Sequence, residues 1–325
     1  MKTPVKITVC LLIVGSAAAA AFARADNYPS KPIKVIVAQP AGGVSDIRAR
    51  AYARRLSESM GQPFVVENRP GASGAIGVEA VRKAPPDGYT ILFGTNQDLI
   101  VTPVLDASMH YSAVRDFAPI ALAAAGYPLL LVSPSLGVKS FAELVALAKA
   151  RPGGLSCGTG GHATPGHFVC AYLSMQAGIS LVAVPYKGSA PALVDAASGQ
   201  VQIAFGFIAE SQSYIKTGKL VPLTVFGPRR LSEFPDVPTI AELGYQGLEL
   251  FSWGCFMAPA GTPPEVVKRL NAEVIKAAKQ PEMAEWLART GSVFIPLTPE
   301  RFGELLQSET AKWRRISAET GIRAD

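Results

Sequence analysis

The chain has 325 residues, of which 49% are apolar and 17% are charged, and its formal net charge is +6. This composition excludes an intrinsically disordered chain. The charge is too small and too scattered to predict nucleic-acid binding. At roughly 150 residues per domain, the length indicates two domains.

The first 25 residues have the pattern of a signal peptide. Lys2 and Lys6 precede 17 uncharged residues (7–23), and an Ala-Arg-Ala sequence ends at Ala25. Cleavage there removes three basic residues, which lowers the net charge to +3, and leaves three cysteines. An odd number of cysteines argues against a fold that depends on disulfides. We predict an exported, periplasmic protein without a second membrane span, because no later run of ~18 uncharged apolar residues exists.

Beyond the leader, short runs rich in Val and Ile alternate with helical stretches. This alternation predicts an α/β protein with parallel sheets, which bind ligands at the carboxyl ends of their strands. In chain order, the expected elements are strand 33–37, helix 45–60, strand 64–66, helix 74–84, strands 89–93 and 128–133, a helix opened by Ser140, strand 154–157, helix 164–176, strand 181–186, helix 191–197, and strands 201–207 and 220–226.

The last 60 or so residues are helical. Helices are expected after Thr262, from Pro281 and from Pro299, each with proline at its first position. No linker separates the two expected domains, so the chain should cross between them on strands, near 120–132 and 248–257. The predicted division is a signal peptide (1–25), domain 1 (26–124 plus 248–325) and domain 2 (125–247).

The loop after the first strand is a candidate anion site. Its two glycines allow backbone N–H groups to approach a ligand, and the following helix N-terminus adds partial positive charge. Asp46 is expected to cap its own helix and leave the Gly43 and Val44 amides facing the ligand. An ordinary strand-to-helix turn is the alternative interpretation. The candidate residues are Gln39, Ala41, Gly42, Gly43, Val44, Ser45 and Asp46.

A second loop has the same order of strand, glycine-rich turn and helix N-terminus. Two such loops, one in each domain, could hold one anion between them. A third turn after a strand contains Lys187, which could contact a carboxylate, although a lone lysine there is more often solvated. The candidate residues of the second loop are Gly158, Thr159, Gly160, Gly161, His162, Ala163 and Thr164.

Catalytic and metal-binding patterns have little support. The sequence contains no dinucleotide or P-loop pattern and no G-x-S-x-G nucleophile turn. Cys157, His162, His167 and Cys170 are metal-capable residues without the usual paired spacing. We therefore expect no enzyme activity, no cofactor and no required metal.

The motifs taken together resemble the Bug-type extracytoplasmic receptors of tripartite tricarboxylate transporters. This resemblance implies a two-lobed periplasmic-binding-protein type II-like fold whose cleft closes around a small organic carboxylate. It also implies that backbone amides and ordered waters of the first and second loops hold one carboxylate. The matching segments are 28–33, 40–46, 67–72, 86–90, 184–188, 235–239 and 258–263.

The second lobe departs from the family's pattern where the far end of the ligand is expected. Gly206 stands where relatives commonly have Asp, so an α-amino group has less to pair with, and the glycine should leave room. Phe205 and Phe207 flank it and would line the cleft, unless both face the core of the sheet. With Lys187 or His162 meeting a second carboxylate, the ligand is expected to be an aromatic or medium-length dicarboxylate.

The predicted function is therefore that of a periplasmic receptor, a monomer, that delivers a carboxylate to membrane permease subunits. Two alternatives remain open at this stage. One is a sensory receptor of the same fold, and the other is an exported hydrolase using His162 or His167.

Overall fold

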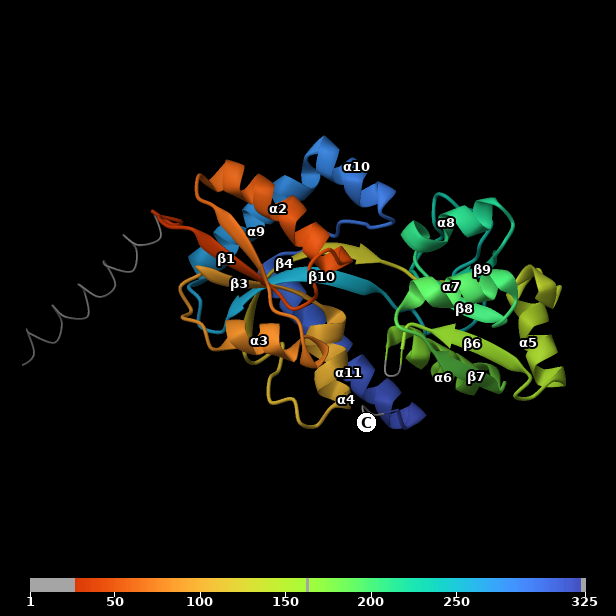
Figure 1. Cartoon of the computed structure of the whole chain (residues 1–325). Coiled ribbons are helices and arrows are strands. Elements are labelled where there is room, and N and C mark those ends of the chain that lie inside the picture. The colour runs from red at the N-terminus through yellow and green to blue at the C-terminus, as the bar shows by residue number, and fades with distance from the viewer. Residues whose placement is uncertain (1–26, 162–163, 323–325) are drawn as a thin grey trace, which may run out of the picture.

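The computed structural model describes residues 27–161 and 164–322, and within these ranges the chain forms two lobes (Figure 1). Each lobe contains one five-stranded sheet among the described residues. The predicted α/β fold with two lobes is confirmed. The predicted signal peptide lies outside the described residues.

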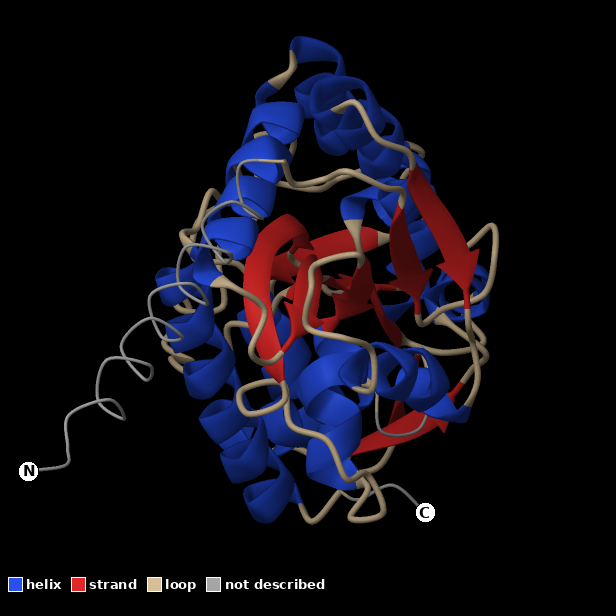
Figure 2. Ribbon diagram, turned by 90° about the vertical axis from the view of Figure 1, so that its left-hand side faces the viewer, coloured by secondary structure: helices blue, strands red, loops and turns tan. Residues whose placement is uncertain are grey.

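The first lobe has the strand order β2-β1-β3-β10-β4. Figure 2 shows its sheet with helices on both sides. Alternate residues of β1 face opposite layers: Val35 packs with α2 and α9, whereas Ile36 packs with α3. The strands are β1 (Ile33–Val37), β2 (Phe64–Asn68), β3 (Thr90–Thr95), β4 (Phe117–Gly126) and β10 (Ser252–Pro259), and the helices are α2 (Val44–Met60), η1 (Ala72–Gly74), α3 (Ala75–Arg82), η2 (Gln97–Val101), α4 (Thr102–Leu105), α9 (Pro264–Lys279), α10 (Pro281–Arg289) and α11 (Pro299–Thr320).

The second lobe has the strand order β7-β6-β8-β5-β9. Its core also has two layers, because β8 places Ile203 and Phe205 on one face and Ala204 on the other. The strands are β5 (Leu129–Val132), β6 (Leu155–Thr159), β7 (Leu181–Pro185), β8 (Ile203–Gly206) and β9 (Val221–Val225), and the helices are η3 (Pro134–Leu136), α5 (Phe141–Ala150), α6 (Pro165–Ala177), α7 (Ser189–Ser198) and α8 (Ile208–Lys216).

The sheets are mixed, so the prediction of parallel sheets is wrong in part. Strand β10 runs antiparallel to β3 and β4, and β5 runs antiparallel to β8 and β9. Strands become parallel when a helical crossover joins each one to the next. No such crossover joins β4 to β5, because only two residues separate these strands at the passage between the lobes, and β10 carries the chain back. Strands β5 and β10 therefore run against their neighbours in the two sheets.

Helix α11 joins the two lobes. Phe302, Leu306, Trp313 and Ile316 form its buried apolar side, and Leu305 is half-buried. Phe302 meets Trp253 of β10 edge to face, with ring centroids 5.8 Å apart. Trp313 meets Phe168 of α6 at 5.2 Å in the same geometry. The helix therefore packs on both lobes and not on one alone, and these large rings contribute much of its packing energy.

Helix ends follow the predicted capping chemistry at two places and differ at a third. Ser140 accepts a hydrogen bond from the Glu143 amide at 3.2 Å, and Thr298 caps α11 through the Arg301 amide at 3.3 Å. Helix α9, however, begins at Pro264, and the Thr262 hydroxyl donates to the Pro259 carbonyl. The helix expected directly after Thr262 therefore begins one residue later than Pro263, and Thr262 does not cap it.

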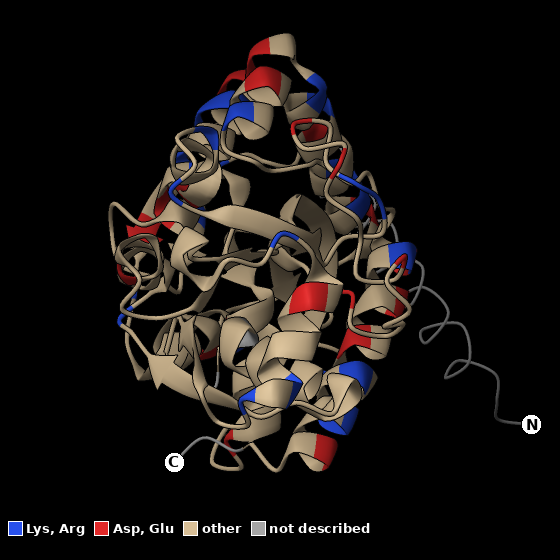
Figure 3. Ribbon diagram, turned by 90° about the vertical axis from the view of Figure 1, so that its right-hand side faces the viewer, with Lys and Arg blue, Asp and Glu red and all other residues tan. Residues whose placement is uncertain are grey.

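Apart from single 3-10 turns, two of the described helical segments were not predicted from the sequence. Segment η2–α4 is short and has no apolar period, and α8 directly follows a strand whose predicted end included Phe207. None of the described helices combines the length and apolarity needed to cross a membrane. On the side of the molecule shown in Figure 3, basic and acidic residues are interspersed rather than gathered by sign.

Candidate functional site

The loop between β1 and α2 presents an uncapped helix N-terminus. Gly42 has φ +79°, a left-handed conformation that favours glycine, and Gly43 is the N-cap residue without a side-chain cap. The Gly43 amide donates to the Pro40 carbonyl at 3.3 Å, so it is not directed at a ligand as predicted. Within the described residues, the amides of Val44 and Ser45 bond no acceptor. These two N–H groups are therefore available to donate hydrogen bonds to an anion.

Asp46 holds this loop rather than capping the helix in the predicted manner. It is the third residue of α2, and its carboxylate accepts from the Gly42 amide at 2.9 Å and pairs with Arg50 at 2.9 Å. Burial alone would raise its pKa, but the bonds from Arg50 and Gly42 outweigh burial and lower it. The carboxylate is thus ionised and neutralised by Arg50, which reduces its repulsion of a bound anion.

Gln39 connects the first loop to the segment after β3. Its side-chain amide donates to Asp98 at 2.6 Å, and the other oxygen of Asp98 accepts from the Thr95 amide (3.0 Å) and hydroxyl (2.9 Å). Asp98 is fully buried, and burial raises its pKa to about 6 against these bonds, which lower it. Gln39 is therefore engaged in positioning the loop.

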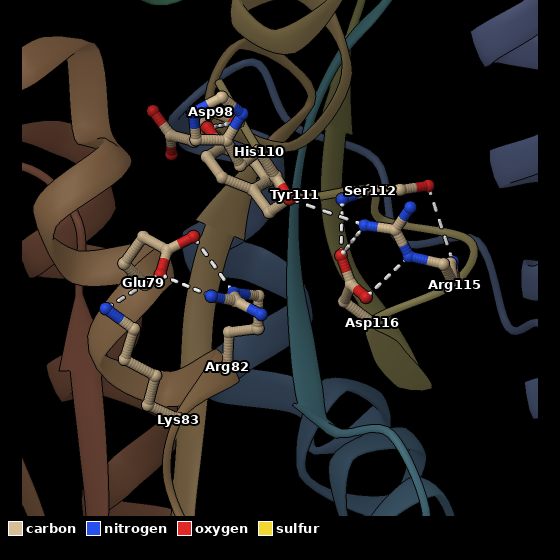
Figure 4. A network of polar contacts seen from close by, with 9 residues as sticks. All are labelled: Glu79, Arg82, Lys83, Asp98, His110, Tyr111, Ser112, Arg115 and Asp116. Atoms are coloured by element: carbon tan, nitrogen blue, oxygen red, sulfur yellow. Dashed lines mark hydrogen bonds and ion pairs between the residues drawn. The ribbon is translucent and has the colours of Figure 1, made fainter. Parts of the chain in front are cut away.

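Polar contacts of the segment 111–116 hold the backbone at Asp98 (Figure 4). Tyr111 donates to the Asp98 carbonyl at 2.5 Å. The adjacent Ser112 amide donates to Asp116 at 2.8 Å, and Asp116 is bound in turn by Arg115. The backbone at Asp98 is thus fixed by the turn that leads into β4.

The second loop is shorter than predicted, because β6 continues through Thr159. Gly158 is packed against Ala192, Val201 and Tyr186, and the buried Thr159 hydroxyl donates to the Gly161 carbonyl at 3.2 Å. Neither residue borders the clefts described below, so their direct contact with a ligand stays a prediction.

Gly160 and Thr164 of the second loop border a pocket between the lobes, whereas Gly161 borders neither of the pockets described below. Thr164 is the N-cap residue of α6, as predicted, but its hydroxyl donates to the Gly161 carbonyl at 2.8 Å instead of accepting from the helix. The Gly188 amide donates to the Gly160 carbonyl at 3.0 Å, which joins the second loop to the third. His162 and Ala163 lie outside the described residues.

Two adjoining pockets lie between the lobes and share Phe207 and Ser252. The α2 pocket, of about 290 Å³, is bordered mainly by Val44, Ser45, Ile47, Arg48, Thr95, Phe207, Glu210, Ser252 and Trp286. The α6 pocket, of about 260 Å³, is bordered mainly by Asn96, Gln97, Gly160, Thr164, Gly166, Ser189, Phe205, Gly206, Phe207 and Ser252. Parts of both predicted loops therefore face one cleft.

Other predicted residues lie elsewhere. Ala41 and Gly42 are exposed and, like Gly43, border neither pocket. Lys187 is exposed in the turn after β7 and also borders neither. No direct contact with a ligand in these pockets is assigned to these four.

Gly206 is the last residue of β8, and its surroundings differ from the prediction. A Cβ at Gly206 would lie 2.9 Å from the Leu193 side chain, so Leu193 fills the space that the missing side chain was predicted to leave free, although Gly206 itself borders the α6 pocket. Phe205 is buried against Phe226 yet borders the α6 pocket, and Phe207 borders both pockets. Glu210, one helical turn further on, lines the α2 pocket and supplies a carboxylate that was not predicted there.

Arg48, Glu210 and Trp286 are cleft residues that the sequence reasoning missed. Arg48 and Trp286 were missed because the apolar pattern of α2 and α10 indicates that these helices pack on a sheet but not which side chains face a cleft. Glu210 was missed because α8 was not predicted. Among the described residues, no group of three His, Cys, Asp or Glu side chains is arranged to hold a metal. Cys157 and Cys170 are buried neighbours, and burial raises the pKa of Cys157.

A two-lobed α/β fold with an anion-attracting cleft at strand and helix ends defines the class of solute-binding receptors. The family model described as tripartite tricarboxylate transporter family receptor matches residues 48–322. The chain belongs to this family, and the predicted Bug-type resemblance is confirmed.

Relatives of this chain include protein BugT of Bordetella pertussis, which is 34% identical over 319 residues and 98% of each chain. Among solved structures, R. palustris Rpa4515 with adipate is 34% identical, with a TM-score of 0.78 over 91% of this chain and 99% of the other. MatC (Rpa3494) from Rhodopseudomonas palustris with bound malate is 28% identical, with a TM-score of 0.73 over 89% and 99%.

Proposed function

We propose that this protein is a periplasmic, monomeric solute-binding receptor that captures a small organic carboxylate for the permease subunits of a tripartite tricarboxylate transporter. The observation that carries the proposal is the uncapped N-terminus of α2, where the Val44 and Ser45 amides open into an interlobe cleft. Membership of the receptor family supports the role, and the adipate and malate bound by two relatives support the ligand class.

The proposed binding mode uses both lobes. One carboxylate lies at the α2 N-terminus, where partial positive charge and free N–H groups favour an anion. The N-terminal turn of α6, at Thr164 and Gly166, approaches from the other lobe. Because a shared anion is better buried when the lobes approach, binding should close the cleft.

The finer proposal is that the ligand is an aromatic or medium-length dicarboxylate. Pockets of about 290 and 260 Å³ that share a wall provide more space than a minimal anion requires. Phe207, Trp286 and Ile47 supply apolar surface for a ligand body.

Calorimetry with mono-, di- and tricarboxylates, together with small-angle scattering, tests the function. We expect saturable binding of at least one diacid, a monomeric mass and a smaller radius of gyration on saturation. Absence of binding by every carboxylate would refute the proposal. Chemical conversion of a bound compound would instead favour an enzyme.

A further inference from the structure

Arg48 is a cation in the cleft without a counterion. Its Nη2 atom donates to the Ser292 hydroxyl at 2.6 Å, and its buried Nε has no hydrogen-bond partner. Within the described part of the chain, no carboxylate lies within the 4.0 Å ion-pair distance of Arg48. By contrast, Arg50 and Arg55 on the same helix pair with Asp46 and Glu282.

Burial makes this arrangement costly in the absence of a partner. Arg48 is half-buried, and this partial burial lowers its pKa. An arginine nevertheless stays protonated, because its ordinary pKa exceeds 12. A buried charge is normally compensated by an opposite charge or by several hydrogen bonds. An anionic group entering the α2 pocket would supply that compensation.

The surface between Arg48 and the helix N-terminus is apolar. Val44 is 58% exposed and Ile47 is 49% exposed, although both border the α2 pocket. Trp286 of α10 and Phe207 of the other lobe complete the apolar lining. Exposed apolar side chains that gather at a pocket are typical of a binding surface.

Helix geometry sets the spacing of the two anion-attracting groups. Val44 and Arg48 are four residues apart, so they lie on the same side of α2, about 6 Å apart along its axis. One carboxylate at the Val44 and Ser45 amides therefore leaves a second group within reach of the Arg48 guanidinium, across the apolar surface.

We propose that Arg48 is the specificity-determining residue of the cleft and binds the second carboxylate of a diacid whose apolar body lies against Ile47 and Trp286. This inference rests on the proposed function, because it assumes that the first carboxylate lies at the α2 N-terminus. It replaces Lys187 and His162 as the partner of the far carboxylate.

Glu210 provides a competing possibility on the opposite wall of the α2 pocket. Its carboxylate would favour a ligand with an ammonium group at the far end. Each group has one neutral partner: Glu210 accepts from the Ser189 hydroxyl at 2.5 Å, and Arg48 donates to the Ser292 hydroxyl. They differ in that Arg48 also has a buried Nε without a hydrogen-bond partner, whereas no oxygen of Glu210 is buried and unsatisfied. The cation therefore has the greater need of a partner, which favours a carboxylate.

Three compounds of equal length distinguish these ligand chemistries: adipate, hexanoate and 6-aminohexanoate, which end in a carboxylate, a methyl group and an ammonium group. Terephthalate and benzoate form the aromatic pair. For the wild type, calorimetry should show tighter binding of at least one diacid than of its monoacid. Tightest binding of 6-aminohexanoate would overturn the inference.

The variants Arg48→Gln and Arg48→Lys test the residue, with Arg54→Gln as the control because Arg54 is exposed on the same helix. Removing charge-assisted hydrogen bonds should weaken diacid binding about 10- to 100-fold in Arg48→Gln and leave monoacid binding nearly unchanged. Arg48→Lys should lose less, because it keeps the charge but not the planar fork. Arg54→Gln should bind as the wild type does.

The outcomes separate this inference from the proposed function. Equal weakening of diacid and monoacid by Arg48→Gln, or no weakening of either, would overturn the role of Arg48 while carboxylate binding stands. Wild-type binding of monoacids but of neither diacid would do the same. Binding of no carboxylate would refute the proposed function as well. Thermal unfolding of each variant verifies that it is folded, and Arg48→Lys provides the test if Arg48→Gln is not.

Discussion

Replacing Asp98 with asparagine should change how stability depends on pH. Asp98 is fully buried, and burial raises its pKa from 3.8 to about 6. The folded protein therefore keeps this proton up to about pH 6, whereas the unfolded chain loses it near pH 4. Between these values the folded state binds more protons, so the contribution of Asp98 to stability falls as pH rises.

The size of the effect follows from the shift. A change of about two pKa units corresponds to about 3 kcal/mol between pH 4 and pH 7, to order of magnitude. Asparagine cannot ionise, yet its oxygen can still accept from Thr95, and a rotated Gln39 amide can accept from its NH₂ group. Burial raises the pKa values of the neighbouring Tyr111 and Cys255, so neither titrates in this window.

Urea unfolding at pH 4, 5, 6 and 7, followed by tryptophan fluorescence, measures the difference between the two proteins. We expect Asp98→Asn to gain about 3 kcal/mol relative to the wild type across this range. Asp106→Asn is the control, because the Ser108 hydroxyl and amide lower the Asp106 pKa, so its contribution changes mainly below about pH 4 and its difference from the wild type should stay nearly constant from pH 5 to pH 7. A difference that is constant with pH, or one that favours the wild type at pH 7, would refute the reasoning.

Three further predictions concern the loop, a cap and the joining helix. Gly42→Val meets no atom within 4 Å, but φ at this position is +79°, so the valine should strain the backbone by about 1–2 kcal/mol. This strain should weaken carboxylate binding in calorimetry, and unchanged affinity would exclude the first loop from the site. Ser140→Ala removes the cap of α5 and should cost about 1 kcal/mol in urea unfolding, which an unchanged midpoint would contradict. Trp313→Ala should lower the free energy of unfolding by about 3–5 kcal/mol because the ring is buried. Trp286→Ala, at a half-buried ring, should lower it much less, and equal losses would contradict the role of α11 in packing on both lobes.

The local order of the chain can be predicted from its sequence. Strand β1 begins and ends as predicted, and α2 begins one residue earlier than predicted. Runs of Val and Ile, glycines at turns and helix caps act over a few residues, so neighbouring side chains suffice to specify them. The family was recognisable for the same reason, since its motifs lie in such turns.

The identity of the cleft residues depended on contacts between distant segments. Arg48 and Ser292 are 244 positions apart, and Glu210 lies in a helix of the other lobe. No local pattern distinguishes Arg48 from the arginines around it on α2. Only the packing of α10 beside α2 shows that Arg48 has a buried Nε and no carboxylate partner, while Arg50 is paired.

Sequence alone therefore determined the alternation of strands and helices, the two glycine-rich turns and the family. Tertiary structure decided that the sheets are mixed, that α11 packs on both lobes and that Leu193 fills the space beside Gly206. The physical reason is that hydrogen bonding and periodicity act within a few residues, whereas burial and charge compensation depend on which distant segments the chain brings together.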